Sequence, residues 1–174
     1  FLLPAAAVMI VFFFIPFFQT FGLSFFDYSS SLYNPNFVGA DNYIKLFKEP
    51  VFYKVMFNTF MYLVIAVPFL VTFPLFLAIL INQKIRGITL YKILLYLPVI
   101  VSIVVAAIAF KWLYAGQGIL NYILSLFHIK SIGWLVDTKW ALFSVALVTI
   151  WKGIGYYMMI YLASLMSVPQ DLYE

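Results

Sequence analysis

Long stretches without a charged residue alternate with short polar segments along this chain. Three uncharged runs cover residues 1–26, 55–81 and 93–110, and a fourth apolar run, residues 140–163, contains a single lysine. A helix needs about 20 residues to cross about 30 Å of hydrocarbon, and each run approaches or exceeds this length. The pattern therefore predicts four transmembrane helices and an all-α, polytopic membrane protein.

The composition supports a membrane protein and excludes several other classes. Of the 174 residues, 66% are apolar and only 9% are charged, and the mean hydropathy is +1.08. The net charge of +4 comes from scattered basic residues, which argues against a nucleic-acid partner. The chain has no cysteine, so disulfides and thiolate metal sites are excluded. The first run is too long for a signal-peptide core and has no small-residue cleavage site, so we expect a retained span.

The charges of the connecting segments predict how the spans are oriented. Residues 82–92 carry three basic residues and no acid, whereas residues 27–54 carry equal numbers of acidic and basic residues. Short loops rich in lysine and arginine stay on the cytoplasmic side. We therefore expect the inner loop 82–92 and the C-terminal end to be cytoplasmic, and the outer loops 27–54 and 111–139 to lie on the opposite side.

Both outer loops contain a segment with helical features. In the first loop, Asp41 is placed to act as the N-cap of a short helix that runs through Phe47. In the second loop, apolar residues recur at helical spacing opposite Asn121 and Ser125, which predicts a short helix in the outer membrane interface and not a span. The apolar positions are Leu120, Ile123, Leu124 and Phe127. His128 has no second histidine or carboxylate nearby in the sequence, so we expect a surface position and no metal site.

Lys152 is the one charged residue inside the fourth apolar run. An ionisable group at that depth costs about 2.5–3.5 kcal/mol on insertion scales, so we expect its side chain to face protein or water. Two arrangements are open: a solute path, or a helix interface where backbone carbonyls or an acid hold the ammonium group. Gly153 and Gly155 predict close helix packing. They do not belong to a phosphate-binding loop, because no Gly-x-x-x-x-Gly-Lys motif follows a strand.

Residues typical of a helix start follow the fourth run. Ser167 can act as N-cap with Gln170 three residues later, and Pro169 fits the first turn, where its missing N–H costs nothing. Asp171 and Glu174 place negative charge near the positive end of the helix dipole. A new helix is therefore expected to begin at Ser167, as the chain leaves the membrane.

This last segment, ASLMSVPQDLYE (residues 163–174), resembles the start of the EAA loop in permease subunits of binding-protein-dependent ABC importers. The similarity is closest to the sugar-type branch, which includes the maltose and glycerol-phosphate permeases. Four further segments are similar to this family in the same order along the chain: residues 37–47 with 57–59, residues 82–87 with 91–92 and 97–98, residues 118–124 with 134–135, and residues 151–156. Only Glu174 of the Glu-Ala-Ala signature is present. We therefore expect residues 1–174 to be a single but partial transmembrane permease domain that ends within the EAA loop.

The resemblance implies a type I ABC importer permease fold and a function. The chain would form the translocation path for a sugar or related small solute and would be coupled to a separate ATPase subunit. The path is expected to include Trp151, Lys152 and Tyr156. The start of the coupling helix, residues 167–174, is expected to contact the ATPase through Pro169, Gln170, Asp171, Leu172, Tyr173 and Glu174. The chain itself is not expected to be an enzyme or to bind a cofactor.

The same resemblance implies partners and a location. The expected partners are an ATP-binding subunit, a second permease subunit, an extracytoplasmic solute-binding protein and the lipid bilayer of a bacterial or archaeal inner membrane, which the chain crosses several times.

Two other functions stay open. A secondary transporter would need inverted repeats and ion sites near the membrane midplane, and a membrane subunit without transport activity would have no ATPase partner. The chain has no Walker, metalloprotease or nucleophile-elbow motif, so no covalent chemistry is assigned.

Overall fold

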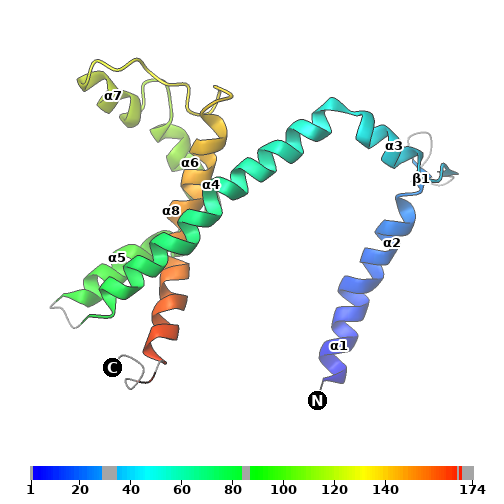
Figure 1. The fold of residues 1–174 in the computed structure, drawn as a ribbon, viewed down its shortest axis with the longest axis horizontal. Helices are drawn as coiled ribbons and strands as arrows, with labels where there is room; N and C mark the ends of the chain where they lie inside the picture. The colour runs from blue at the N-terminus through cyan, green and yellow to red at the C-terminus, as the bar shows by residue number, and fades with distance from the viewer. Residues whose placement is uncertain (1, 29–34, 84–86, 168, 170–174) are drawn as a thin grey trace. The chain divides into compact units, whose positions relative to one another are not determined.

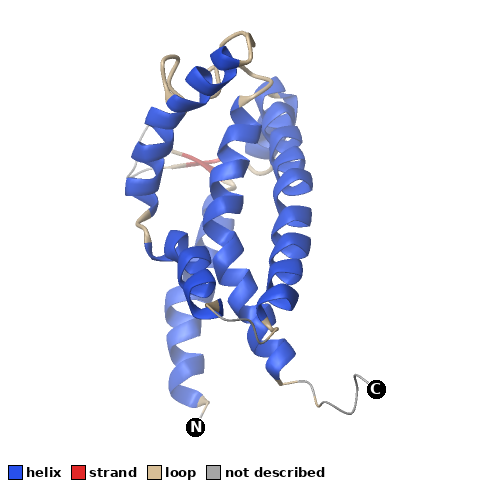
Figure 2. Ribbon diagram, turned by 90° about the vertical axis from the view of Figure 1, so that its left-hand side faces the viewer, coloured by secondary structure: helices blue, strands red, loops and turns tan. Residues whose placement is uncertain are grey.

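The computed structural model describes residues 2–28, 35–83, 87–167 and 169 (Figure 1). The chain divides into two compact units, Phe1–Phe57 and Asn58–Glu174, which we describe separately. Helices dominate, and the described residues contain one pair of short strands (Figure 2). Three helical segments are long and apolar enough to cross a membrane, or four if a bent pair forms one span. The all-α, polytopic membrane fold is therefore confirmed.

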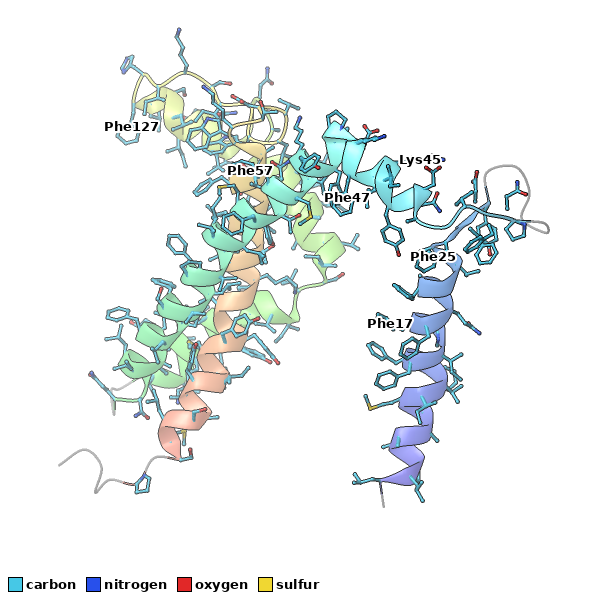
Figure 3. All side chains as sticks on the ribbon, turned by 45° about the vertical axis from the view of Figure 1, so that its right-hand side comes forward. Phe17, Phe25, Lys45, Phe47, Phe57 and Phe127 are labelled. Carbon is cyan, nitrogen blue, oxygen red and sulfur yellow. The ribbon has the colours of Figure 1, made fainter. Side chains whose placement is uncertain are left out.

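The first apolar run forms a helical segment with one irregular turn. It consists of α1 (Leu3–Met9), a π-helical turn η1 (Ile10–Phe14) and α2 (Ile15–Leu23). The irregular turn lies just before Pro16, which has no N–H to donate to the preceding turn. Local π adjustments of this kind satisfy the freed backbone groups in membrane helices. No residue of these three segments is buried, and the Phe17 side chain points away from the helix axis (Figure 3).

Two short antiparallel strands and a helix complete the first unit: β1 (Phe26–Asp27), β2 (Asn36–Phe37) and α3 (Asp41–Lys48). Side chains of α3 attach this helix to the end of α2. Asn42 donates to the carbonyls of Ser24 (2.9 Å) and Phe26 (3.0 Å), and the hydroxyls of Ser24 and Tyr43 lie 2.6 Å apart. The loop 27–54 is thus held by hydrogen bonds close to the end of the first span.

The capping role predicted for Asp41 is wrong. Helix α3 begins at Asp41 itself, Ala40 occupies the N-cap position, and no side chain there caps the helix. The Asp41 carboxylate instead accepts a hydrogen bond from Lys45, one turn later, at 2.9 Å. This hydrogen bond and the charge of Asp41 raise the pKa of the Lys45 ammonium group. An acid in the first turn still complements the helix dipole, so Asp41 supports the helix from inside it.

The second long helix, α4 (Pro50–Ile81), begins ahead of the predicted range 55–81 and ends where predicted. Pro68 and Pro74 lie inside it. Pro74 is fully buried, and its ring therefore forms part of a packing surface. Prolines are tolerated inside membrane helices when neighbouring groups satisfy the backbone.

The third apolar run is broken, in contrast to the single continuous span predicted for residues 93–110. It forms two helices, α5 (Ile88–Ile100) and α6 (Ile103–Leu113). The two helices are bent by 96° relative to each other. Val101 and Ser102 are extended between them, with ψ angles of 129° and 140°. Pro98 weakens the last turns of α5, because it cannot donate to the carbonyl four residues earlier.

Two more helices complete the second unit: α7 (Ile119–Leu126) and α8 (Ala141–Met166). Helix α8 lies along α5, and its buried Met158 and Leu162 form a core with Ala78 and Ile81 of α4. Small residues at such contacts allow membrane helices to approach closely. This packing brings the middle of α8 to the break between α5 and α6.

Candidate functional site: a cavity beside the broken span

A cavity of about 450 Å³ lies where α8 passes the break between α5 and α6. Helices α4, α5 and α6 each contribute one apolar residue, and α8 contributes the polar and aromatic ones. The lining residues are Leu70, Val99, Ile103, Thr149, Lys152, Gly153, Tyr156 and Tyr157. An apolar hollow with a few converging polar groups is the usual form of a small-molecule site.

Lys152 reaches the backbone at the break. Its Nζ atom lies 3.3 Å from the carbonyl oxygen of Pro98, 3.2 Å from that of Val99 and 2.7 Å from that of Val101. The last four carbonyls of a helix have no donor within the helix, so the ammonium group supplies donors that α5 lacks. The side chain is half-buried, and in the described part of the chain no carboxylate forms an ion pair with it.

Gly155 explains why α8 comes so close to α5. A Cβ atom at this position would overlap the carbonyl oxygen of Leu95 and lie 3.0 Å from the Cα atom of Tyr96. Glycine is therefore required for the contact between the two backbones. Gly153 differs, because its Cβ would meet the end of the flexible Leu70 side chain at 2.7 Å. The close packing predicted for both glycines is present, and it is tighter at Gly155.

Two of the three predicted path residues meet at the cavity. Lys152 and Tyr156 both line it, and the half-exposed Tyr156 ring packs edge-on against Tyr157, with the ring centroids 5.4 Å apart. Trp151 is not among the lining residues; its ring packs against Phe110 of α6, at a centroid distance of 5.1 Å. The assignment of these residues to a solute path stays a prediction.

Sequence reasoning missed several lining residues. Thr149, whose hydroxyl accepts a hydrogen bond from Tyr62 at 2.7 Å, lies three residues before Lys152 and seven before Tyr156. This spacing puts the three side chains on one face of a helix, so it could have revealed Thr149. Leu70 and Val99 carry no comparable signal, because apolar residues occupy most positions of their helices.

The loop 111–139 is organised around Asn121 of α7. This residue is buried, and its side-chain nitrogen donates to the carbonyls of Ala115 (3.1 Å) and Ile132 (3.0 Å). Its side-chain oxygen accepts from the backbone N–H of Ile132 (2.9 Å) and from the indole N–H of Trp134 (3.2 Å). Asn121 thus satisfies four groups with one side chain.

The predicted short helix in this loop is present as α7. Asn121 is buried, whereas Ile123 is exposed, as is Phe127 (Figure 3). The position of this helix in the membrane interface stays a prediction. Leu120 and Leu124 are half-buried. His128 is exposed, as expected, and no cluster of metal-ligating side chains occurs among the residues that the structure describes.

The predicted ATPase-coupling residues fall mostly outside the described part of the chain. Ser167 ends α8, and its hydroxyl donates to the carbonyl of Ser164 at 2.7 Å. Pro169 is exposed. Gln170, Asp171, Leu172, Tyr173 and Glu174 lie outside the described residues, so the coupling helix stays a prediction.

Comparisons with known proteins give a consistent result. No protein-family profile matches the chain. It is 35% identical to the probable ABC transporter permease protein YurN of Bacillus subtilis over 179 aligned positions, covering 100% of this chain and 61% of the relative. It is 32% identical to the lactose transport system permease protein LacF of Rhizobium radiobacter, covering 100% of this chain and 59% of the relative. The chain thus spans about three fifths of the length of these relatives.

A solved structure shares the fold. It is the crystal structure of a bacterial ABC transporter involved in the import of the acidic polysaccharide alginate. One of its chains superposes with a TM-score of 0.80 at 25% sequence identity, covering 99% of this chain and 58% of that one. The fold of this chain is therefore similar to that of a chain in a known ABC transporter.

Proposed function

This chain belongs to the family of ABC transporter permease proteins, and from that premise we propose that it is part of the membrane subunit through which an ATP-driven importer moves its solute. The observation that carries the proposal is the identity of 35% to a permease over the entire chain. No nucleotide-binding motif occurs in the sequence, so ATP hydrolysis is assigned to a separate subunit. A secondary transporter or a non-transport subunit has no comparable support.

The transported solute is proposed to be a sugar or a related small polyhydroxy compound. The LacF relative is named for lactose, and the structural neighbour for alginate. The lining of the cavity beside α8 includes three hydroxyl-bearing residues, Thr149, Tyr156 and Tyr157, of which the two tyrosines are aromatic. Hydroxyls of a sugar can exchange hydrogen bonds with such groups, and its C–H faces can pack on aromatic rings.

The proposed mechanism is alternating access. A solute-binding protein delivers solute on the outer side, and closure of the ATPase dimer moves a cytoplasmic coupling helix that begins near Pro169. Because α8 leads directly to this region and lines the cavity, movement of the coupling helix would be passed to the cavity wall. Rigid-body closure of this kind is a common switching transition.

Copurification tests the proposal. The full-length permease, expressed with its ATPase and second permease subunits, should purify as one complex and should accumulate solute in proteoliposomes only when ATP and the binding protein are present. Uptake driven by an ion gradient without ATP would instead identify a secondary transporter. A stable permease that binds no ATPase would contradict the importer assignment.

Charge reversal at the coupling segment, Glu174→Lys, is expected to separate ATP hydrolysis from transport. The coupling helix would enter a groove on the ATPase, and reversing the charge of a residue in that helix would disturb the contact. We expect ATPase activity to persist while uptake falls by about 10-fold or more, a loss of roughly 1.4 kcal/mol in coupling. Both rates are measured in proteoliposomes.

Glu49→Lys is the matched control for this change. Glu49 follows α3 in the first outer loop and is exposed, so the same charge reversal there should leave coupling intact. Equal loss of uptake in the two variants would argue against a coupling role of Glu174.

Membrane orientation gives a further prediction. Thr89 at the start of α5 and Ser131 in the second outer loop are both exposed, and the 174 residues contain no natural cysteine. Single cysteines at these positions are expected to react differently with a membrane-impermeant maleimide added to intact cells, with Ser131→Cys labelled and Thr89→Cys protected. Labelling of both from outside would contradict the cytoplasmic placement of residues 82–92.

A further inference from the structure

The backbone at the break in the third span lacks donors. Helix α5 ends at Ile100, and the carbonyls of its last turn have no N–H partner further along, because Val101 and Ser102 are extended. In the hydrocarbon region no water is available to replace such partners. A bend of 96° at this place is therefore stabilised by polar groups from another helix.

The side chain of Lys152 provides these groups. A lysine ammonium carries three N–H bonds and no acceptor, and Nζ has three carbonyl oxygens within 3.3 Å, those of Pro98, Val99 and Val101. Its positive charge also lies at the C-terminal end of α5, where the helix dipole is negative. One side chain of α8 thus acts as a C-terminal cap for α5.

The position of the cap is set by backbone packing. Gly155 lies three residues after Lys152 on α8 and brings the α8 backbone against Leu95 and Tyr96 of α5. The lysine stem then needs to pass only about one turn of α5 to reach Pro98. Charged hydrogen bonds of this kind are stronger than neutral ones, so the contact is suited to hold two helices in a fixed register.

We propose that Lys152 is a positioning residue, which holds the third span bent at Val101 and thereby shapes the cavity wall, and that it is not itself a hydrogen-bond donor to solute. All three of its donors have carbonyl partners, and none is left for a ligand. Val99 and Ile103, on either side of the break, both line the cavity, so a change in the bend displaces two walls at once. The consequence for transport rests on the proposed function, whereas the capping of α5 does not.

Distance measurements between spin labels test the capping directly. Leu90 on α5 and Val104 on α6 are exposed, with 60% and 63% of their surfaces accessible, so nitroxide labels on cysteines there should report the bend in the full-length complex. Lys152→Met is expected to broaden or shift the distance distribution, because its side chain has similar length and no donor. Lys152→Arg, which keeps charge and donors, is expected to preserve the wild-type distribution.

Two further variants complete the distance measurements. Lys111→Met removes an exposed lysine from α6 of the same broken span and should leave the distances unchanged. If Lys152→Met does not accumulate, Lys152→Gln replaces it: glutamine can donate at most two hydrogen bonds without charge, and a broadened distribution is again expected. A wild-type distribution in the methionine or glutamine variant, or an arginine variant as disturbed as the methionine one, would overturn the proposal.

Uptake measurements then separate this inference from the proposed function. In proteoliposomes, Lys152→Met should lower the ATP-driven uptake rate by about 10-fold or more, as expected for loss of charge-assisted hydrogen bonds, and Lys152→Arg should restore it substantially. Normal uptake by Lys152→Met would overturn the positioning role. Absence of uptake in the wild type would instead refute the proposed function, and the distance result would stand independently.

Discussion

Replacing Gly155 with alanine is expected to destabilise the permease by about 3 kcal/mol or more, at the upper end for overpacked sites. The new methyl group would overlap the carbonyl oxygen of Leu95, and neither this carbonyl nor the Cα atom of Tyr96 can move without displacing α5. Displacement of α5 would also withdraw the carbonyls that Lys152 contacts. Thermal unfolding of the purified full-length complex, followed by size-exclusion chromatography, measures the effect.

Gly153→Ala is the matched control for this substitution. Gly153 lies on α8 two residues before Gly155. The methyl group of an alanine at this position would meet the end of the Leu70 side chain. That side chain can rotate away, and alanine favours the helix by about 1 kcal/mol over glycine, so the stability should change little. Equal melting temperatures for the two variants would show that α5 and α8 do not pack as closely as described.

The second large effect is expected for Asn121→Leu, which should loosen the loop 111–139. Leucine has a similar volume but no polar atoms, so the N–H groups of Ile132 and Trp134 would lose their acceptor, and two backbone carbonyls their donor. A buried group without a partner costs about 1–3 kcal/mol. Some of these four polar groups can reach water when the loop opens. We therefore expect the free energy of unfolding to fall by about 3 kcal/mol in total.

Limited proteolysis measures this loosening. Lys130 is exposed in the same loop, and trypsin should cleave after it much faster in Asn121→Leu than in the wild type, because local opening controls access to the peptide bond. Ser125→Ala is the control: its exposed hydroxyl bonds only to Tyr122 of the same helix. Unchanged cleavage in Asn121→Leu would mean that the loop is held by its apolar contacts alone.

Much of the fold could be predicted because lipid imposes one requirement on every spanning segment. Hydrocarbon offers no hydrogen-bond partners, so long uncharged runs must be helical. For this reason the runs 1–26 and 55–81 correspond closely to α1–α2 and α4. The same reasoning singled out Lys152, since a buried ammonium group needs polar partners, and backbone carbonyls were among the partners expected.

Part of the candidate site was also predictable from the sequence. The polar residues of α8 stand out from an apolar helix, and Lys152 and Tyr156 do line the cavity. Trp151 does not, because helical geometry points neighbouring residues in different directions, and its ring packs on Phe110. Apolar wall residues such as Leu70 could not be predicted, because nothing distinguishes them from residues that face lipid.

The sequence by itself determined that this protein is a helical membrane protein, where its apolar runs lie, and that Lys152 must find polar partners. Only the tertiary structure decided that the third span is broken and that Asn121 faces inward. Local patterns report whether a residue prefers lipid or polar surroundings, but not which distant group provides them. Lys152 and Val101 are separated by 51 residues, and Asn121 and Ile132 by 11, so their partners are defined only when the chain is packed.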